Sequence, residues 1–185
     1  MSEESVRKPS GHCNFLFVGS GVQRKGLHVL CKAWSDLQPS DAHLTIVARS
    51  MDPSIRELVP RNNATLLSGV SPSQLEEEYR KAHVFVMPSL VEGFGYVYLE
   101  ALRFGCYCIG TENSGLPDLG QLTGVAELVV PGSVQDLQAA LARASQKHSA
   151  GELDGKAPQL KVKEYPWLRF RESIVSAVAA GPSIA

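Results

Sequence analysis

Two acidic residues, Glu92 and Glu100, flank what the sequence predicts to be a strand-to-helix turn. Glu92 follows the apolar stretch 83–87, and Glu100 lies in a helical pattern that begins after Gly95. The backbone N–H groups of residues 93–96 would open that helix, and such a terminus attracts anions. Glu100, about one turn inside the helix, can accept hydrogen bonds from ligand hydroxyls, whereas Glu92 projects from the loop towards the helix terminus. This layout indicates a site for a phosphorylated sugar.

A turn that contains glycine, between the first predicted strand and helix, is a second candidate for phosphate binding. Gly19-Ser20-Gly21 gives a flexible backbone for close approach, and Arg24 and Lys25 supply two cations for a diphosphate. The alternative is an ordinary turn with a solvated basic pair, although a helix start disfavours cations unless an anion binds there. Arg24 also stands where the third glycine of a Gly-x-Gly-x-x-Gly pattern would be, so a dinucleotide oxidoreductase is poorly supported.

The elements that must position these residues alternate between short apolar strands and helical patterns. Strands are predicted at 15–18, 44–48, 65–67, 84–87, 107–109 and 126–130, and helices at 26–37, 54–59, 74–82, 96–104 and 134–144. Such alternation is typical of an α/β fold, a Rossmann-like parallel sheet sandwiched by helices. Ligands of these sheets bind beyond the carboxyl ends of the strands, where strand order reverses.

The domain organisation follows from the same pattern. Residues 1–12 are expected to form a flexible lead, 13–147 the domain itself, 148–164 a surface connection, and 165–181 a terminal helix that packs on the domain.

Composition excludes several classes of function. A chain of 185 residues with 44% hydrophobic residues fits one well-buried core, and a net charge of −1 gives no field for nucleic acid. No stretch is long and apolar enough to span a membrane, and the polar opening lacks the features of a signal peptide, so a cytoplasmic location is expected. The four cysteines lack metal-ligand spacing and are interpreted as buried and structural.

In the two turns described above and in the segments around them, the chain resembles a known family. This is the C-terminal, nucleotide-sugar-binding half of retaining GT-B glycosyltransferases, of the glycosyltransferase family 4 type (group 1). The resemblance covers residues 14–144, and the segments that carry it are 17–27, 88–95 (PSLVEGFG), 99–105, 110–118 and 127–132.

The resemblance implies a role for each candidate residue. It assigns Glu92 to the transferred sugar and Glu100 to the ribose hydroxyls, with Arg24 and Lys25 stabilising the departing diphosphate. The expected catalytic residues are Glu92, Lys25 and Arg24; the expected donor-binding residues are Gly19, Ser20, Gly21, Arg24, Lys25, Glu92, Gly93, Phe94, Gly95, Tyr96 and Glu100.

A structural interpretation of the same residues stays open beside the functional one. Glu92 could be a plain loop acid, and Glu100 a surface acid paired with Arg103 or Lys81. Phe94 and Tyr96 could be core aromatics, and for Tyr96 the core position is the preferred interpretation.

The resemblance predicts a retaining hexosyltransferase of carbohydrate biosynthesis, in which this chain binds the donor, a nucleoside-diphosphate sugar. The sequence does not choose between a UDP-sugar and a GDP-sugar, and neither a cofactor nor a metal is expected. The acceptor site is expected on an N-terminal domain or a partner chain, so this chain alone is predicted to be inactive. The alternatives are a non-catalytic nucleotide-sugar-binding subunit or sensor, and one half of a GT-B epimerase.

Overall fold

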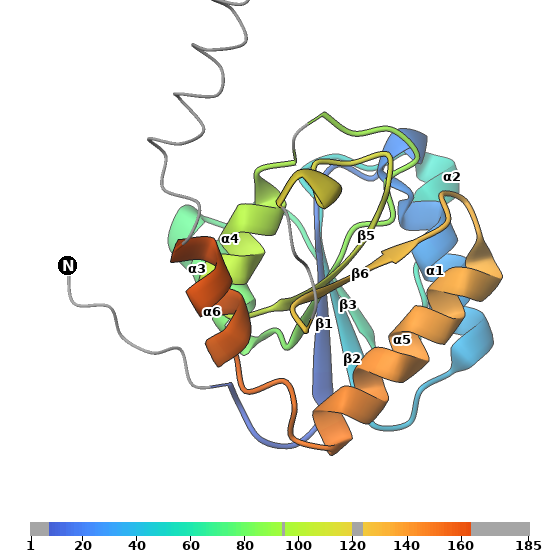
Figure 1. Cartoon of the computed structure of the whole chain (residues 1–185). Coiled ribbons are helices and arrows are strands. Elements are labelled where there is room, and N and C mark those ends of the chain that lie inside the picture. Colours follow the sequence, from blue (N-terminus) through green and yellow to red (C-terminus); the bar gives the residue numbers. More distant parts are fainter. Residues whose placement is uncertain (1–7, 94, 120–123, 164–185) are drawn as a thin grey trace, which may run out of the picture.

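A six-stranded parallel sheet forms the centre of the molecule, with helices on both of its faces (Figure 1). The computed structural model describes residues 8–93, 95–119 and 124–163. The strands are β1 Cys13–Val18, β2 Ala42–Val47, β3 Ala64–Leu67, β4 Val84–Val86, β5 Tyr107–Thr111 and β6 Ala126–Val129. The helices are α1 Leu27–Leu37, α2 Pro53–Arg56, α3 Pro72–Lys81, α4 Val97–Arg103, α5 Val134–Ser149 and α6 Lys156–Lys163, with 3₁₀ turns η1 Gln23–Lys25 and η2 Pro117–Leu119. The predicted Rossmann-like fold class is confirmed.

The order of the strands creates a place for a ligand. The sheet runs β3-β2-β1-β4-β5-β6, so the chain builds outwards from β1 to β3 and then returns to the other side of β1. The order reverses between β1 and β4, which pair in parallel with Phe15 opposite Val84. The loops after these two strands hold the predicted phosphate turn and the predicted acidic turn. Ligands of doubly wound sheets bind at this kind of reversal.

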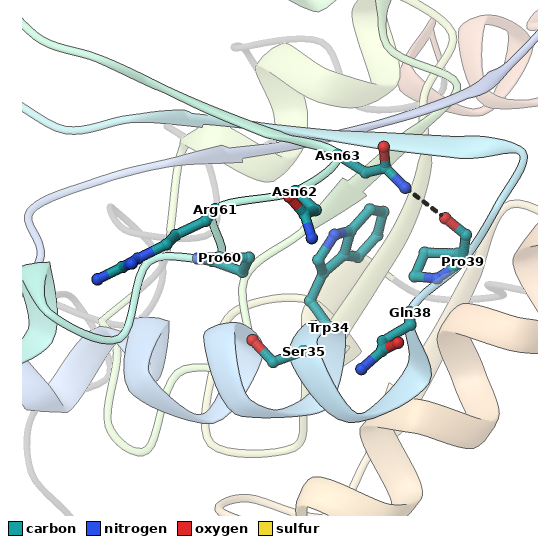
Figure 2. Close-up of a pocket in the computed structure, with 8 residues that line it drawn as sticks. All are labelled: Trp34, Ser35, Gln38, Pro39, Pro60, Arg61, Asn62 and Asn63. Carbon is teal, nitrogen blue, oxygen red and sulfur yellow. Dashed lines mark hydrogen bonds between the residues drawn. The ribbon is translucent and has the colours of Figure 1, made fainter.

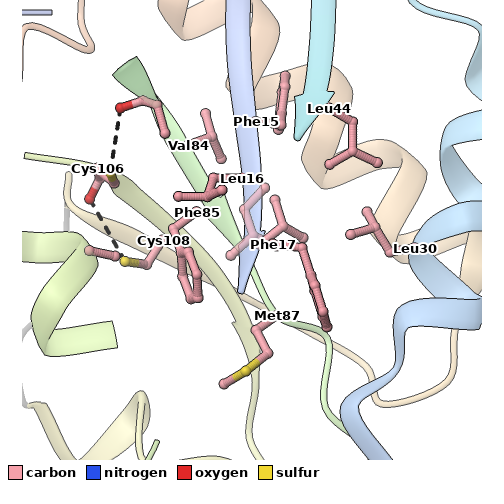
Figure 3. Close-up of a cluster of buried hydrophobic side chains, with 14 of the residues drawn as sticks. Phe15, Leu16, Phe17, Leu30, Leu44, Val84, Phe85, Met87, Cys106 and Cys108 are labelled. Atoms are coloured by element: carbon pink, nitrogen blue, oxygen red, sulfur yellow. Dashed lines mark hydrogen bonds between the residues drawn. The ribbon is translucent and has the colours of Figure 1, made fainter. Parts of the chain in front are cut away.

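The central strands are apolar on both faces because helices cover both sides of the sheet. All residues of β4 and β5 are buried, as are Phe15, Leu16 and Phe17 in β1. Figure 3 shows these β1 side chains beside those of the neighbouring strands β2 and β4. On one face α1 and α5 pack together, and on the other α4 contacts α6 (Figure 1).

The ends of the domain differ from the expectation. Lys8 and Pro9, expected to belong to a flexible lead, contact the segment between α3 and β4: Lys8 Nζ donates a hydrogen bond to the Ala82 carbonyl, and the Pro9 carbonyl lies 2.9 Å from His83 Nε2. The segment 148–164, expected to be a connection, contains α6. The mixture of Gly, Lys, Asp, Ser and Pro in this segment favoured a connection, whereas in the structure α6 packs against α4, with a hydrogen bond of 3.2 Å from the Gln159 amide to the Arg103 carbonyl. The predicted helix 165–181 lies outside the described residues.

Two predicted helices have other lengths. The helix expected at 54–59 is the single turn α2, and the helix expected at 134–144 continues as α5 to Ser149.

Candidate functional site

The loop after β1 is held against the loop after β2 by backbone hydrogen bonds. Gly19 donates to the Val47 carbonyl (3.0 Å) and Gly21 to the Ser50 carbonyl (2.7 Å), while Asp52 donates back to Gly21 (2.9 Å). These contacts continue the parallel pairing of β1 and β2 beyond the strands. The predicted phosphate turn is therefore a fixed segment at the carboxyl edge of the sheet.

Gly26 ends this turn in a conformation that favours glycine. It has φ 70° in the left-handed region and precedes the first residue of α1. A Cβ at this position would lie 1.9 Å from the carbonyl oxygen of Pro88. The glycine thus allows the turn after β1 to touch the segment after β4, which brings the two predicted halves of the site together.

Lys25 and Glu92 form an ion pair at the place where the strand order reverses between β1 and β4. Their side chains are only 13% and 11% exposed, and Lys25 Nζ donates to Glu92 Oε2. Arg24 approaches the other oxygen, with Nη1 3.8 Å from Oε1, and its side chain is 57% exposed. The three predicted catalytic residues therefore lie together, although 67 positions separate Lys25 from Glu92 in the sequence.

The backbone around Glu92 is held by neighbouring loops. Glu92 donates its N–H to the carbonyl of Asn113 (3.0 Å), and the Asn113 amide donates to the Leu90 carbonyl (3.0 Å). Leu90 in turn donates to the carbonyl of Arg24 (2.8 Å). Asn113 was not among the predicted site residues; the signal that could have found it is its place in the loop directly after a buried strand.

Glu100 has a partner that the sequence did not suggest. Its Oε2 accepts a hydrogen bond of 2.9 Å from the Tyr79 hydroxyl on α3. Burial, reinforced by the Glu100 carboxylate, raises the pKa of Tyr79 far above its ordinary value, so the phenol remains a donor. Lys81, one of the expected partners of Glu100, pairs with Glu77 and Glu78 instead. Tyr79 thus fixes one carboxylate oxygen of Glu100. Glu100 is exposed and keeps its other acceptor positions. Its contact with the ribose stays a prediction.

Among the aromatic residues between Glu92 and Glu100, the buried and the exposed ones differ from the expectation. The core interpretation of Tyr96 is wrong, because this residue is 51% exposed. The buried aromatic is Tyr98, whose hydroxyl donates to the Met87 carbonyl (2.8 Å). Helix periodicity was the missing criterion: Tyr98 faces the sheet, and Tyr96 precedes the first residue of α4. Phe94 lies outside the described residues.

The arrangement is suited to an anion with a hydroxylated neighbour. One cation is shielded, one is exposed, and a carboxylate lies between them at the edge of the sheet. The space beside Gly93 is open, since a Cβ there would meet no atom within 4 Å. Among the described residues, no group of three or more His, Cys, Asp or Glu side chains is placed to hold a metal ion.

The chain matches the family described as glycosyl transferases group 1 over residues 12–147. It belongs to this family. A curated relative, the sulfoquinovosyl transferase SQD2 of Arabidopsis thaliana, is 32% identical over 97 residues, which are 51% of this chain and 19% of the relative. The chain spans less than a third of the length of this and other curated relatives.

Two solved structures share the fold of this chain. The C-terminal domain of the group 1 protein LpcC from Francisella tularensis aligns with a TM-score of 0.70 at 18% identity, over 82% of this chain and 85% of that one. Anabaena HepE, in complex with UDP and glucose, aligns with a TM-score of 0.72 at 14% identity, over 96% of this chain and 54% of that one. The chain thus shares the fold of the C-terminal domain of LpcC.

In the part of the chain that the structure describes, none of the helices has the length and apolar character needed to cross a membrane.

Proposed function

We propose that this chain is the donor-binding domain of a retaining glycosyltransferase, which binds a nucleoside-diphosphate sugar and presents it to an acceptor hydroxyl. The observation that carries the proposal is the meeting of Arg24, Lys25 and Glu92 at the reversal of strand order. Family membership and the fold shared with a protein that holds UDP and glucose support it. Transfer would require a second domain for the acceptor, on the same or another chain.

Donor binding would break the ion pair between Lys25 and Glu92. A diphosphate carries more charge than a single carboxylate, so it would draw the Lys25 ammonium away from Glu92. The released carboxylate would then be free to accept a hydrogen bond from a sugar hydroxyl. Arg24, already more exposed, would complete the cationic side of the diphosphate and stabilise its charge as it departs.

Alanine in place of Lys25 should weaken nucleoside diphosphate binding by about 1.5–3 kcal/mol, the usual contribution of a charge-assisted hydrogen bond. The free nucleoside should lose less, because it lacks the phosphates. Calorimetry with UDP, GDP and their nucleosides, in the presence of a chelator, measures these differences without divalent metal. Lys32→Ala is the matched control, since Lys32 is an exposed cation of α1 that pairs with Asp36.

The same variant should also be less stable. Loss of Lys25 removes the partner of Glu92 Oε2, while Oε1 keeps the Gly93 N–H (3.1 Å) and the more distant Arg24, so stability should fall by about 1–3 kcal/mol. A Lys25→Ala, Glu92→Gln double variant should recover part of this loss. Equal losses of nucleoside and diphosphate binding, or binding that vanishes with chelator, would count against the proposed phosphate site.

The two glutamates should separate by ligand. Glu100→Gln is expected to weaken every ligand that contains the ribose by a few-fold, as one lost hydrogen bond does. Glu92→Gln should leave the bare diphosphate bound at least as well, because Lys25 no longer has a competing carboxylate, and should weaken only the intact sugar nucleotide. Titration of both variants with UDP, GDP and their glucose and mannose conjugates measures this. Indistinguishable profiles would remove the proposed division of roles.

A further inference from the structure

A cavity of about 320 Å³ lies at the amino ends of the strands, opposite the end that holds the candidate donor site. Its walls come from the last turn of α1, the segment that leads to β2 and the segment that leads to β3. The lining residues are Trp34, Ser35, Gln38, Pro39, Pro60, Arg61, Asn62 and Asn63 (Figure 2).

The topology separates this cavity from the donor site. It lies at the amino ends of β2 and β3, whereas the loops with Lys25 and Glu92 follow the carboxyl ends of β1 and β4. The length of β2 alone, six residues, corresponds to roughly 20 Å. A ligand in the cavity would therefore not touch the donor residues.

Trp34 brings an unsatisfied donor to the wall of the cavity. The residue is 2% exposed, and its indole Nε1 is buried without a hydrogen-bond partner among the described residues. Figure 2 shows the ring between Asn62 and Pro39, with the indole nitrogen on the side of Asn62. Buried donors are nearly always paired, so this N–H calls for an acceptor. The side chain of Asn62, an exposed residue, lies beside this nitrogen at the wall of the cavity (Figure 2).

The remaining lining favours a neutral ligand. The amides of Gln38 and Asn62 and the hydroxyl of Ser35 each both donate and accept, as sugar hydroxyls do. Arg61 is the one charged residue of the lining, and in Figure 2 it extends away from the indole. The end of α1 adds partial negative charge, which disfavours an anion.

We propose that this cavity is a saccharide site that accepts one neutral sugar ring, with a ring or hydroxyl oxygen accepting the hydrogen bond of the Trp34 indole. The two prolines supply apolar surface for the C–H face of the ring, and the amides contact its hydroxyls. The volume is at the lower end of the range of small-molecule sites and suits a single ring. The site is separate from the proposed donor site and does not depend on it.

The test follows the indole N–H signals in proton–nitrogen NMR spectra during titration with glucose, mannose, galactose and N-acetylglucosamine, each with UDP and GDP present to occupy the donor site. The sequence contains two tryptophans, so Trp34→Phe assigns the signals while it keeps an aromatic ring in the core. At least one sugar should shift the Trp34 signal in a saturable way. Asn62→Ala should weaken that affinity by about three- to tenfold, the range expected for the loss of one hydrogen bond.

Gln146→Ala, which removes an exposed amide on α5, is the matched control and should leave the affinity unchanged. Glu92→Gln should leave it unchanged as well, which separates this result from failure of the donor proposal. The proposal is overturned if no sugar shifts the Trp34 signal, if Asn62→Ala and Gln146→Ala behave alike, or if inorganic phosphate shifts the signal and the sugars do not.

Discussion

Alanine at position 26 is expected to lower the free energy of unfolding by at least about 3 kcal/mol, because two penalties combine there. The left-handed φ of 70° disfavours any residue with a Cβ, and the new methyl group would lie 1.9 Å from the Pro88 carbonyl oxygen. That oxygen belongs to the backbone of the acidic turn, so relief of the clash must separate the two halves of the site. Urea unfolding of the variant measures the loss.

Gly93→Ala is the matched control, because position 93 lies in the same site but has room for a Cβ. It should change stability little, and nucleoside diphosphate binding should survive in it better than in any folded fraction of Gly26→Ala. A Gly26→Ala protein as stable as Gly93→Ala would show that the turn does not lie against Pro88.

Acid should destabilise the domain through His83, by up to about 3 kcal/mol between pH 6.5 and 4. Burial lowers the pKa of His83 to about 4. The Asn14 contact also favours the neutral ring, because Nδ1 accepts the N–H of Asn14 (3.0 Å). Nε2 then donates to the carbonyl of Pro9 (2.9 Å), a contact that raises the pKa but is outweighed by burial. Protonation would place a second donor against the Asn14 N–H, and His148 and Lys8 add repulsion.

The sign follows from the two protonation states. The unfolded chain takes up a proton near pH 6.5, while the folded protein does so only near pH 4, so this stability is fully present above 6.5 and is lost as the pH falls towards 4. His83→Gln should lower stability at pH 7 and flatten this part of the pH profile. His12→Gln, at an exposed position, should keep the wild-type slope. Thermal unfolding across the range checks this, and a slope identical in the two variants would exclude His83 as its source.

The strands and the order of the elements could be predicted from local pattern. Runs such as Val84-Phe85-Val86 are apolar without interruption, which a parallel sheet covered on both faces requires, and each lies between helical patterns. Some helix boundaries differ from the predicted ones by one to three residues because caps fix them. Helix α3 begins one residue after Ser71, where Ser71 and Gln74 form a reciprocal capping box. The length of α5 and the existence of α6 were not predicted, since residues 145–149 add no buried apolar position to the helical pattern and α6 packs against α4.

The sequence by itself predicted the glycines, cations and acids of the candidate site, because they follow two apolar strands at characteristic spacings, but it did not predict Asn113. Only the tertiary structure decided how they meet. It placed Lys25 on Glu92 through the reversal of strand order, and it gave Glu100 a partner, Tyr79, from a helix whose local pattern carries no sign of that contact. It likewise placed Trp34 at a cavity formed by three separate segments. The physical reason is that residue type and period report which side of an element is buried, whereas ion pairs and cavities depend on which elements lie side by side.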